Sequence, residues 1–196
     1  MIPPSLPIDR VYTGFYCEEN VYLLCQRFLK DAKIHEHWQP FVMFISNENK
    51  TVALWNQKNG REEGTPVVWD YHVVLVIRPR NMEIGVDTEM DSVPEGESWV
   101  YDMDSRLESP CPWNGRFSGT IVIQTKSWAV YFNGTFPEDM NADGSYIAPP
   151  PSYAPLQKTS NLMSCFVDVK MQEGEGLDGK YGIVLDRDEV DELFGR

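Results

Sequence analysis

The sequence feature that most constrains the fold is the run at residues 66–78, PVVWDYHVVLVIR. It is rich in valine and aromatic residues and has no internal glycine or proline, which is typical of a β-strand. Both of its faces are largely apolar, so we predict a central strand that is covered on each side. Side chains alternate along a strand, which places Asp70 and His72 on one face and Trp69 and Tyr71 on the other. A buried imidazole without partners would cost about 1–3 kcal/mol, so we expect His72 to have polar partners in the fold.

Length and charge define the broad class of the protein. The 196 residues (22.5 kDa) can bury one sizeable core, and we expect a single domain over residues 1–196. The net charge of −13 disfavours nucleic-acid binding, because a phosphate backbone would be repelled. No apolar tract is long enough to cross a bilayer, so we expect no membrane association. We also expect a monomer.

Cysteine usage and the first residues bear on the cellular compartment. The N-terminal sequence MIPPSLPIDR has no basic stretch followed by an apolar one, so we predict no secretory signal and a cytoplasmic or nuclear location. Free thiols are the default there, and the four cysteines show no metal-type spacing. We expect Cys25 and Cys165 in the core and Cys111 in a loop. Two loop histidines, His35 and His37, are too few for a metal site, and we predict no metal and no cofactor.

A helix is predicted at residues 17–30, after an irregular, proline-containing arm at residues 1–12. Its apolar stripe consists of Val21, Leu24, Cys25 and Phe28. Acidic residues lie in its first turn and basic residues in its last turn, as the helix dipole favours. The helix places Cys17 at its N-terminus, where unsatisfied N–H groups would favour a thiolate.

The remaining segments are predicted as strands and loops. Residues 41–46 and 51–56 are expected to form a β-hairpin. Residues 98–102 are expected to form a strand that pairs with the central strand through a long hairpin, with an acidic insertion at 79–97 as its loop. Further predictions along the chain are a turn-rich segment at 111–119, a strand at 120–125, a short helix at 127–132, a proline-rich loop at 134–160, a short element at 161–169, a strand at 180–185 and a closing helix to about residue 194.

Three residues stand out by their predicted placement. Cys17 opens a helix, His72 is the only histidine in a predicted core element, and Asp102 lies on the neighbouring strand. An antiparallel register with 72 opposite 102 would bring the two Cβ atoms to about 4.5–5.5 Å, which suits an imidazole–carboxylate hydrogen bond. A cysteine nucleophile needs this arrangement, because the histidine takes the thiol proton and the acid orients the histidine.

Each of the three signals also has a structural explanation. A cysteine near a helix start is usually structural, and a lone strand histidine is usually a satisfied core residue. Asp102 has Asp104 close by and could simply begin a turn. From the residues alone, a Cys–His–Asp hydrolase and an ordinary packed core both remain open.

Four strings of the sequence narrow this choice. They are YCEEN at 16–20, VMFISNE at 42–48, WDYHVVL at 69–75 and YDMD at 101–104. In this order and at these separations, they resemble the protein N-terminal glutamine amidohydrolases, the WDYHV-motif family. The resemblance covers most of residues 11–110 and continues weakly beyond them. The chain departs from the family pattern in its acidic insertion and in having YDMDS where YDLDT is expected.

The resemblance implies a fold, an activity and roles for residues. The fold would be α+β and papain- or transglutaminase-like, with a mainly antiparallel sheet and the nucleophile at a helix N-terminus. The activity would be conversion of an N-terminal glutamine of a protein or peptide to glutamate, with release of ammonia, in an N-degron pathway. By matching position, Cys17 would be the nucleophile, His72 the general base and acid, and Asp102 the orienting carboxylate.

Restriction to an N-terminal residue requires a group that binds a free α-ammonium, such as a carboxylate. Asp70, predicted on the face of His72, and Glu18, beside the nucleophile, are the candidates for substrate binding. Alternatively, Asp70 braces a loop and Glu18 only favours the helix start. Two other functions stay open: a different thiol acyl-transfer enzyme, such as a peptidase or a transglutaminase, and a non-catalytic module that binds N-terminal residues.

Overall fold

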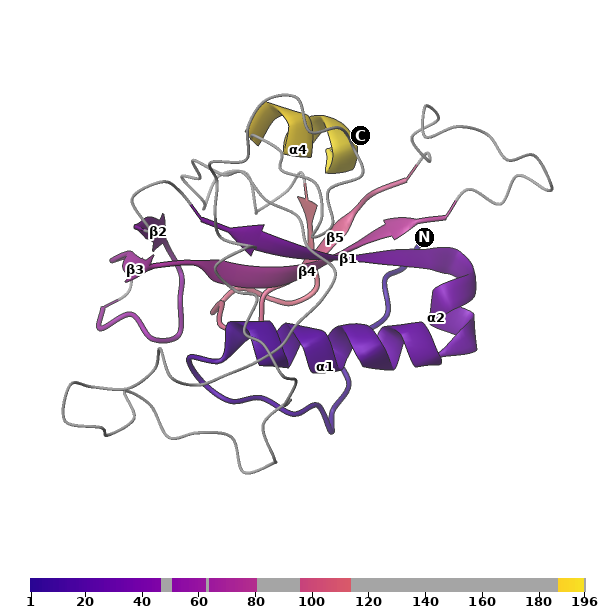
Figure 1. Cartoon of the computed structure of the whole chain (residues 1–196), viewed down its shortest axis with the longest axis horizontal. Helices are drawn as coiled ribbons and strands as arrows, with labels where there is room; N and C mark the ends of the chain where they lie inside the picture. Colours follow the sequence, from indigo (N-terminus) through magenta and orange to yellow (C-terminus); the bar gives the residue numbers. More distant parts are fainter. Residues whose placement is uncertain (47–50, 63, 81–95, 114–186, 196) are drawn as a thin grey trace, which may run out of the picture.

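The computed structural model describes residues 1–46, 51–62, 64–80, 96–113 and 187–195 (Figure 1). The described elements, in chain order, are α1 (Cys17–Lys30), α2 (Ala32–His37), β1 (Trp38–Ile45), β2 (Val52–Leu54), β3 (Val67–Trp69), β4 (His72–Pro79), β5 (Trp99–Tyr101), β6 (Cys111–Pro112) and α4 (Arg187–Phe194). Helix α1 has the predicted bounds, and α4 closes the described part as expected. None of the helices in these ranges is long and apolar enough to span a membrane.

The strands form one antiparallel sheet of four and a separate ribbon of two. The larger sheet has the order β1-β4-β5-β6, and the ribbon pairs β2 with β3. Strand β4 therefore lies in the interior of the sheet, between β1 and β5. The prediction of an α+β fold with a mainly antiparallel sheet is confirmed.

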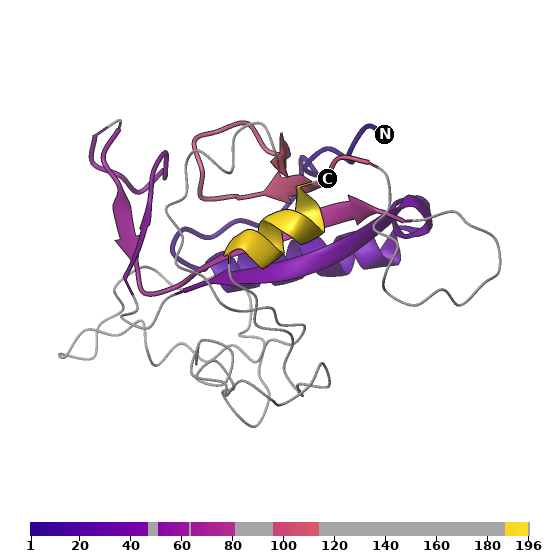
Figure 2. The same ribbon diagram turned by 90° about the horizontal axis from the view of Figure 1, so that it is seen from above.

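The sheet is sandwiched between two helices, with α1 below it and α4 above it in Figure 1; Figure 2 shows the same elements from above. Alternate side chains of β4 enter different cores. Val73, Leu75 and Ile77 pack in the cluster that contains the apolar face of α1. Val74 and Val76 pack in the cluster that contains α4. The prediction that this strand is covered on both sides is confirmed.

The central run is not one continuous strand, however. The chain leaves the β conformation at Asp70 and Tyr71, so 66–78 is divided into β3 and β4. The Asp70 carboxylate accepts a hydrogen bond from the backbone N–H of Tyr71 (2.9 Å), and its carbonyl accepts one from the Ser46 hydroxyl (3.1 Å). The break overturns the predicted alternation: Asp70 is exposed whereas His72 is buried, and Trp69 packs in the α4-side cluster rather than with Tyr71.

The predicted hairpin of residues 41–46 and 51–56 is also wrong. β1 pairs with β4 over its whole length, and β2 pairs with β3, so the two segments belong to different sheets. The loop expected around His35 and His37 is the helix α2. Its N-cap is Asp31, whose carboxylate accepts hydrogen bonds from the backbone N–H groups of Lys33 and Ile34.

Two further predictions need correction or fall outside the described residues. Cys111 is not in a loop but buried in β6, within the segment predicted to be turns. The cysteines of the described ranges are free thiols, as expected, and Cys25 is partly buried against the α1-side core. The elements predicted at 120–185, the proline-rich loop and Cys165 lie outside the described residues, as does most of the acidic insertion.

Candidate active site

Cys17 is the first residue of α1 and is almost completely buried. Its Sγ lies 3.5 Å from Oε2 of Glu18 and accepts a hydrogen bond from the backbone N–H of Val73. The second contact places the sulfur directly beside the start of β4, one residue after His72. The helix start and the central strand, which are far apart in the sequence, thus meet at the thiol.

A tight turn fixes the entry of the chain into α1. Phe15 has a φ of 70°, which is unusual for a residue with a side chain, and Tyr16 N–H donates to the Thr13 carbonyl. Asn20 pins this turn from the first turn of the helix, because its side-chain amide bonds both the N–H (2.8 Å) and the carbonyl (2.7 Å) of Thr13. The orientation of Cys17 at the helix start is therefore set by the turn before it and by Asn20 after it.

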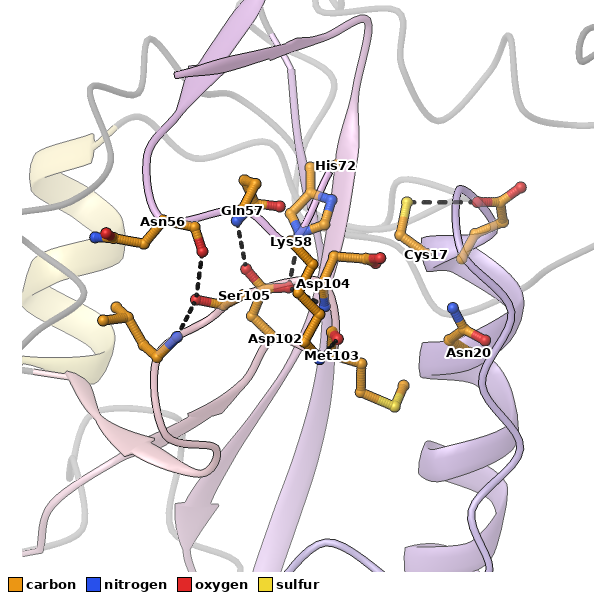
Figure 3. Close-up of polar contacts among 12 residues, drawn as sticks. Cys17, Asn20, Asn56, Gln57, Lys58, His72, Asp102, Met103, Asp104 and Ser105 are labelled. Carbon is orange, nitrogen blue, oxygen red and sulfur yellow. Dashed lines mark hydrogen bonds and ion pairs between the residues drawn. The ribbon is translucent and has the colours of Figure 1, made fainter. Parts of the chain in front are cut away.

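His72 is fully buried, and its Nε2 lies 3.0 Å from Oδ1 of Asp102. In Figure 3 the imidazole lies between Asp102 and Cys17, with its Nδ1 edge on the side of the sulfur. Nδ1 is buried, and no described residue forms a hydrogen bond with it. The indole of Trp69 covers the ring, with the two ring centres 5.1 Å apart. The imidazole is thus fixed at one nitrogen and available at the other.

The register that brings His72 and Asp102 together differs from the predicted one by two residues. Leu75 lies opposite Tyr101 and Val76 lies opposite Val100, so position 102 corresponds to position 74 and not to 72. β5 also ends one residue before Asp102. A shift of two residues keeps every side chain on its face of the sheet, and the contact of the imidazole and the carboxylate is preserved.

The Asp102 carboxylate receives three hydrogen bonds from described residues. Oδ1 accepts from His72 and from the backbone N–H of Asp104 (3.0 Å), and Oδ2 accepts from the side-chain amide of Gln57 (3.1 Å). Asp104 is itself buried and accepts a hydrogen bond from the hydroxyl of Tyr12 (2.7 Å). The carboxylate is therefore held in one orientation (Figure 3).

The buried pair shifts both of its pKa values toward the charged forms. Burial alone would lower the pKa of His72, but the charge and hydrogen bond of Asp102 raise it above its usual value. Burial alone would raise the pKa of Asp102, but His72, Gln57 and the backbone N–H of Asp104 lower it. The imidazole is thus a stronger base than a free histidine.

The expected low pKa of Cys17 is not what the structure shows. Burial raises the pKa of the thiol well above its usual value, and the charges of Glu18 and Asp104 raise it further. The N–H of Val73 acts in the opposite direction but does not compensate. The prediction of a thiolate considered only the helix start. Desolvation and the charges of the two carboxylates outweigh that effect here.

The two candidates for binding an α-ammonium differ in position. Glu18 is half-buried and contacts the sulfur, and its charge also raises the pKa of His72. Asp70 is exposed and its carboxylate binds the N–H of the next residue, which is the loop-bracing arrangement considered as the alternative. Glu18 thus lies beside the reacting groups of the site, whereas Asp70 bonds the backbone of its neighbour at the strand break.

Three donor side chains lie close enough together to hold a cation. The nearest ligand atoms of His72, Asp102 and Asp104 all lie within 4.8 Å of one another. However, these groups already form hydrogen bonds within the protein. The Asp102 carboxylate bonds Nε2 of His72 and the Gln57 amide, and the Asp104 carboxylate bonds the Tyr12 hydroxyl. This set fits a protein hydrogen-bond network as it stands, and the expectation of no metal and no cofactor stays a prediction.

Several residues of the site were missed in the sequence analysis. Asp104 follows Asp102 at the strand period of two, so the YDMD string did carry a signal for a second inward carboxylate. Gln57 and Tyr12 carried none, because one opens a charged loop and the other ends an irregular arm. Their roles come from pairing between segments that are distant in the sequence.

Comparison with known proteins gives a consistent result. The family model described as N-terminal glutamine amidase matches residues 12–194. Proteins named protein N-terminal glutamine amidohydrolase from Drosophila erecta and Drosophila melanogaster are each 34% identical to the chain over 179 residues, which is 89% of this chain and 85% of theirs. The protein of the same name from Drosophila ananassae is 33% identical over the same length.

Proposed function

The chain belongs to the N-terminal glutamine amidase family, and we propose that it hydrolyses the side-chain amide of an N-terminal glutamine to give glutamate and ammonia. The observation that carries this proposal is the buried His72–Asp102 pair, whose second ring nitrogen has no described partner and lies on the side of the Cys17 sulfur. This is the arrangement that a thiol-dependent amide hydrolysis requires. The enzyme is thus a hydrolase that acts on a linear amide.

In the first half of the reaction, Cys17 attacks the amide carbon of the glutamine side chain. His72 takes the thiol proton at Nδ1 as a new bond forms between Sγ and the carbon. The resulting oxyanion would be met by backbone N–H groups at the start of α1, which the side chain of the N-cap residue Tyr16 does not cap. His72 then gives its proton to the amide nitrogen, the C–N bond breaks, and ammonia leaves a thioester on Cys17.

In the second half, water replaces ammonia. The neutral imidazole of His72 accepts a proton from the water molecule while the water oxygen attacks the thioester carbon. The C–S bond breaks, the thiol recovers its proton from His72, and glutamate is released. Asp102 stays ionised throughout and stabilises each imidazolium, because its own pKa is lowered by three hydrogen bonds.

Glu18 is the better placed of the two candidates for binding the substrate α-ammonium. It is 3.5 Å from the sulfur, and a glutamine side chain spans only a few bonds between its amide carbon and its ammonium. The surroundings of the thiol are also rich in negative charge, since Asp104 and Glu18 both raise its pKa. A bound ammonium would offset part of this charge and make the thiol easier to deprotonate. Recognition of the chain terminus would then assist the attack.

The finer assignment of the fold and the cellular role are part of the same proposal. A nucleophile at the first residue of a helix, with its histidine on β4 and its acid directly after the adjacent antiparallel strand β5, supports a papain- or transglutaminase-like arrangement. The substrates would be proteins and peptides that begin with glutamine, in an N-degron pathway. The net charge of −13 supports a protein that does not bind nucleic acid. A monomeric state, a cytoplasmic or nuclear location and the absence of membrane binding stay predictions.

The direct test is to incubate the protein with a peptide that begins with glutamine and to measure ammonia and the mass of the product. We expect conversion of glutamine to glutamate by the wild-type protein and none by Cys17→Ala. The same peptide with an acetylated N-terminus, and one with only internal glutamine, should react far more slowly.

The alternatives would give different outcomes in this assay. Transfer of the acyl group to an added amine, with little glutamate formed, would indicate a transglutaminase-like enzyme. Cleavage of the peptide chain would indicate a peptidase. Binding without turnover would indicate a module that only recognises N-terminal residues. Each of these outcomes would contradict the proposed hydrolysis.

A further inference from the structure

Gln57 makes the contact on Asp102 that none of the predicted site residues provides. Oδ1 of Asp102 is shared by His72 and the backbone N–H of Asp104, whereas the side-chain amide of Gln57 is the only described donor to Oδ2. Gln57 is almost fully buried at the start of the loop after β2. Because an ionised carboxylate only accepts hydrogen bonds, the N–H₂ end of this amide must face Asp102. The contact therefore favours the charged form of the acid.

The backbone around Gln57 is tied to the segment that carries Asp102. Lys58 N–H donates to the Asp104 carbonyl (2.7 Å), Arg106 N–H donates to the Asn56 carbonyl (2.6 Å), and Gln57 forms an isolated β-bridge with Ser105. These backbone contacts lie on both sides of the side-chain contact. Figure 3 shows the Gln57 amide against the Asp102 carboxylate. The amide of Gln57 thus approaches the carboxylate from a fixed backbone.

We propose that Gln57 is a positioning residue of the hydrolysis: by holding Oδ2 of Asp102 it keeps Oδ1 on Nε2 of His72, and so keeps Nδ1 directed to the side of Cys17. The inference rests on the proposed function and extends it to a residue that does not touch the reacting atoms. Without Gln57 the carboxylate would be held at Oδ1 alone. It could then rotate about its terminal torsion, which is broad, and would orient the imidazole only part of the time.

The test is Gln57→Met, which keeps the length and much of the volume of the side chain but lacks the N–H donor. We expect kcat for a glutamine-starting peptide to fall about tenfold to a hundredfold, the range for a lost hydrogen bond to a charged group. KM should change less than about twofold, because Gln57 does not contact the substrate. Unchanged kcat, or a loss expressed mainly in KM, would overturn the proposal.

A double-mutant cycle separates positioning from a general structural role. If Gln57 acts through Asp102, then Gln57→Met should cost almost nothing further in an Asp102→Asn background. Losses that multiply would overturn the inference. Ser105→Ala is the matched control, because the Ser105 hydroxyl bonds the Asn56 carbonyl in the same pair of segments without touching Asp102. We expect this variant to keep the wild-type kcat.

An NMR titration of the His72 ring gives a readout that does not depend on turnover. Gln57→Met should lower the pKa of His72 relative to the wild type, because a less constrained Asp102 stabilises the imidazolium less. Should Gln57→Met not fold, Gln57→Asn keeps a polar amide one methylene shorter, and the same decrease in kcat and pKa is expected. An unshifted pKa contradicts the inference, whereas absence of ammonia release by the wild-type protein contradicts the proposed function.

Discussion

The two sides of the His72 ring are built differently. On the Nε2 side, Asp102 accepts hydrogen bonds from the ring, from a backbone amide and from Gln57, all at 3.0–3.1 Å. On the Nδ1 side, no described residue bonds the nitrogen. The nearby sulfur lies 3.5 Å from the Glu18 carboxylate and accepts a hydrogen bond from the N–H of Val73. The first side is complete without substrate. On the second side, Nδ1 of His72 is available to form a hydrogen bond with a reacting group.

The electrostatics of the two sides differ in the same way. The Asp102 side lowers the pKa of the acid and raises that of the imidazole, so the ionised pair is favoured there. The sulfur side raises the pKa of Cys17, because burial and the charges of Glu18 and Asp104 disfavour the thiolate. The comparison indicates that the acid side is preorganised, whereas the surroundings of the sulfur disfavour the thiolate.

The largest effect is expected from breaking the preorganised side with Asp102→Asn. The amide keeps the shape of the side chain but removes the charge that stabilises the imidazolium. We expect kcat to fall about 10²–10⁴-fold, the range for loss of effective general acid–base catalysis. Steady-state kinetics with a glutamine-starting peptide gives the value.

The matched control for this variant is Asp9→Asn. It removes the same charge from an exposed carboxylate, which forms a 2.9 Å ion pair with Arg27 on the outer face of α1. Because exposed pairs contribute little, this variant should stay within about twofold of the wild type. Comparable losses in the two variants would mean that the charge at Asp102 has no special role.

The pH dependence of kcat/KM tests the Asp102 side through the pKa of His72, the general base. His72 must be neutral to accept the thiol proton, so kcat/KM should fall about tenfold per pH unit below its pKa. Burial would lower this pKa, but Asp102 raises it above 6.5, so the midpoint of the acid limb should lie above 6.5. In Asp102→Asn the main opposition to burial is lost, while the charges of Asp104 and Glu18 remain, so the midpoint should move to lower pH. A wild-type midpoint below 6.5 would contradict this account.

A smaller effect is expected on the sulfur side from Glu18→Gln. Loss of the carboxylate should lower the pKa of Cys17, since its charge raises it, and alkylation of this thiol at neutral pH should become faster. KM for a glutamine-starting peptide should rise about tenfold, which corresponds to about 1.4 kcal/mol of lost ammonium binding. Mass mapping of the alkylated cysteines and steady-state kinetics give the two values.

Cys25 is the internal control for the alkylation measurement. It lies on the same helix, and burial raises its pKa to about 11. Its reactivity should be the same in Glu18→Gln and in the wild type. Slower alkylation of Cys17 in the variant would show that Glu18 does not suppress the thiolate.

The preorganised side was the more predictable one from the sequence. His72 and Asp102 were correctly placed on one face of the sheet although the predicted register was wrong, because the error was two residues. Gln57 could not be found in this way, since it meets Asp102 through pairing between the loop after β2 and the chain after β5. Such contacts depend on tertiary structure and leave no local pattern.

The sulfur side was predicted less well, for a physical reason. A helix N-terminus favours a thiolate, but that local effect was weighed without the burial of Cys17 and the approach of Asp104. The prediction that Asp70 lies on the face of His72 was wrong for a related reason. The alternation rule assumes an unbroken strand, whereas Asp70 bonds the N–H of Tyr71 with its own side chain and ends the β conformation there.

The smallest effect is therefore expected from Asp70→Asn. The side-chain oxygen of asparagine can still accept the hydrogen bond from Tyr71 N–H, so the break between β3 and β4 should be kept. KM and kcat for a glutamine-starting peptide should both stay within about twofold of the wild type, as an exposed charge without a substrate contact predicts. A large rise in KM at unchanged kcat, with Glu18→Gln behaving as the wild type, would instead identify Asp70 as the partner of the ammonium. That result would place substrate recognition at the strand break and leave Glu18 with an effect on the thiol alone.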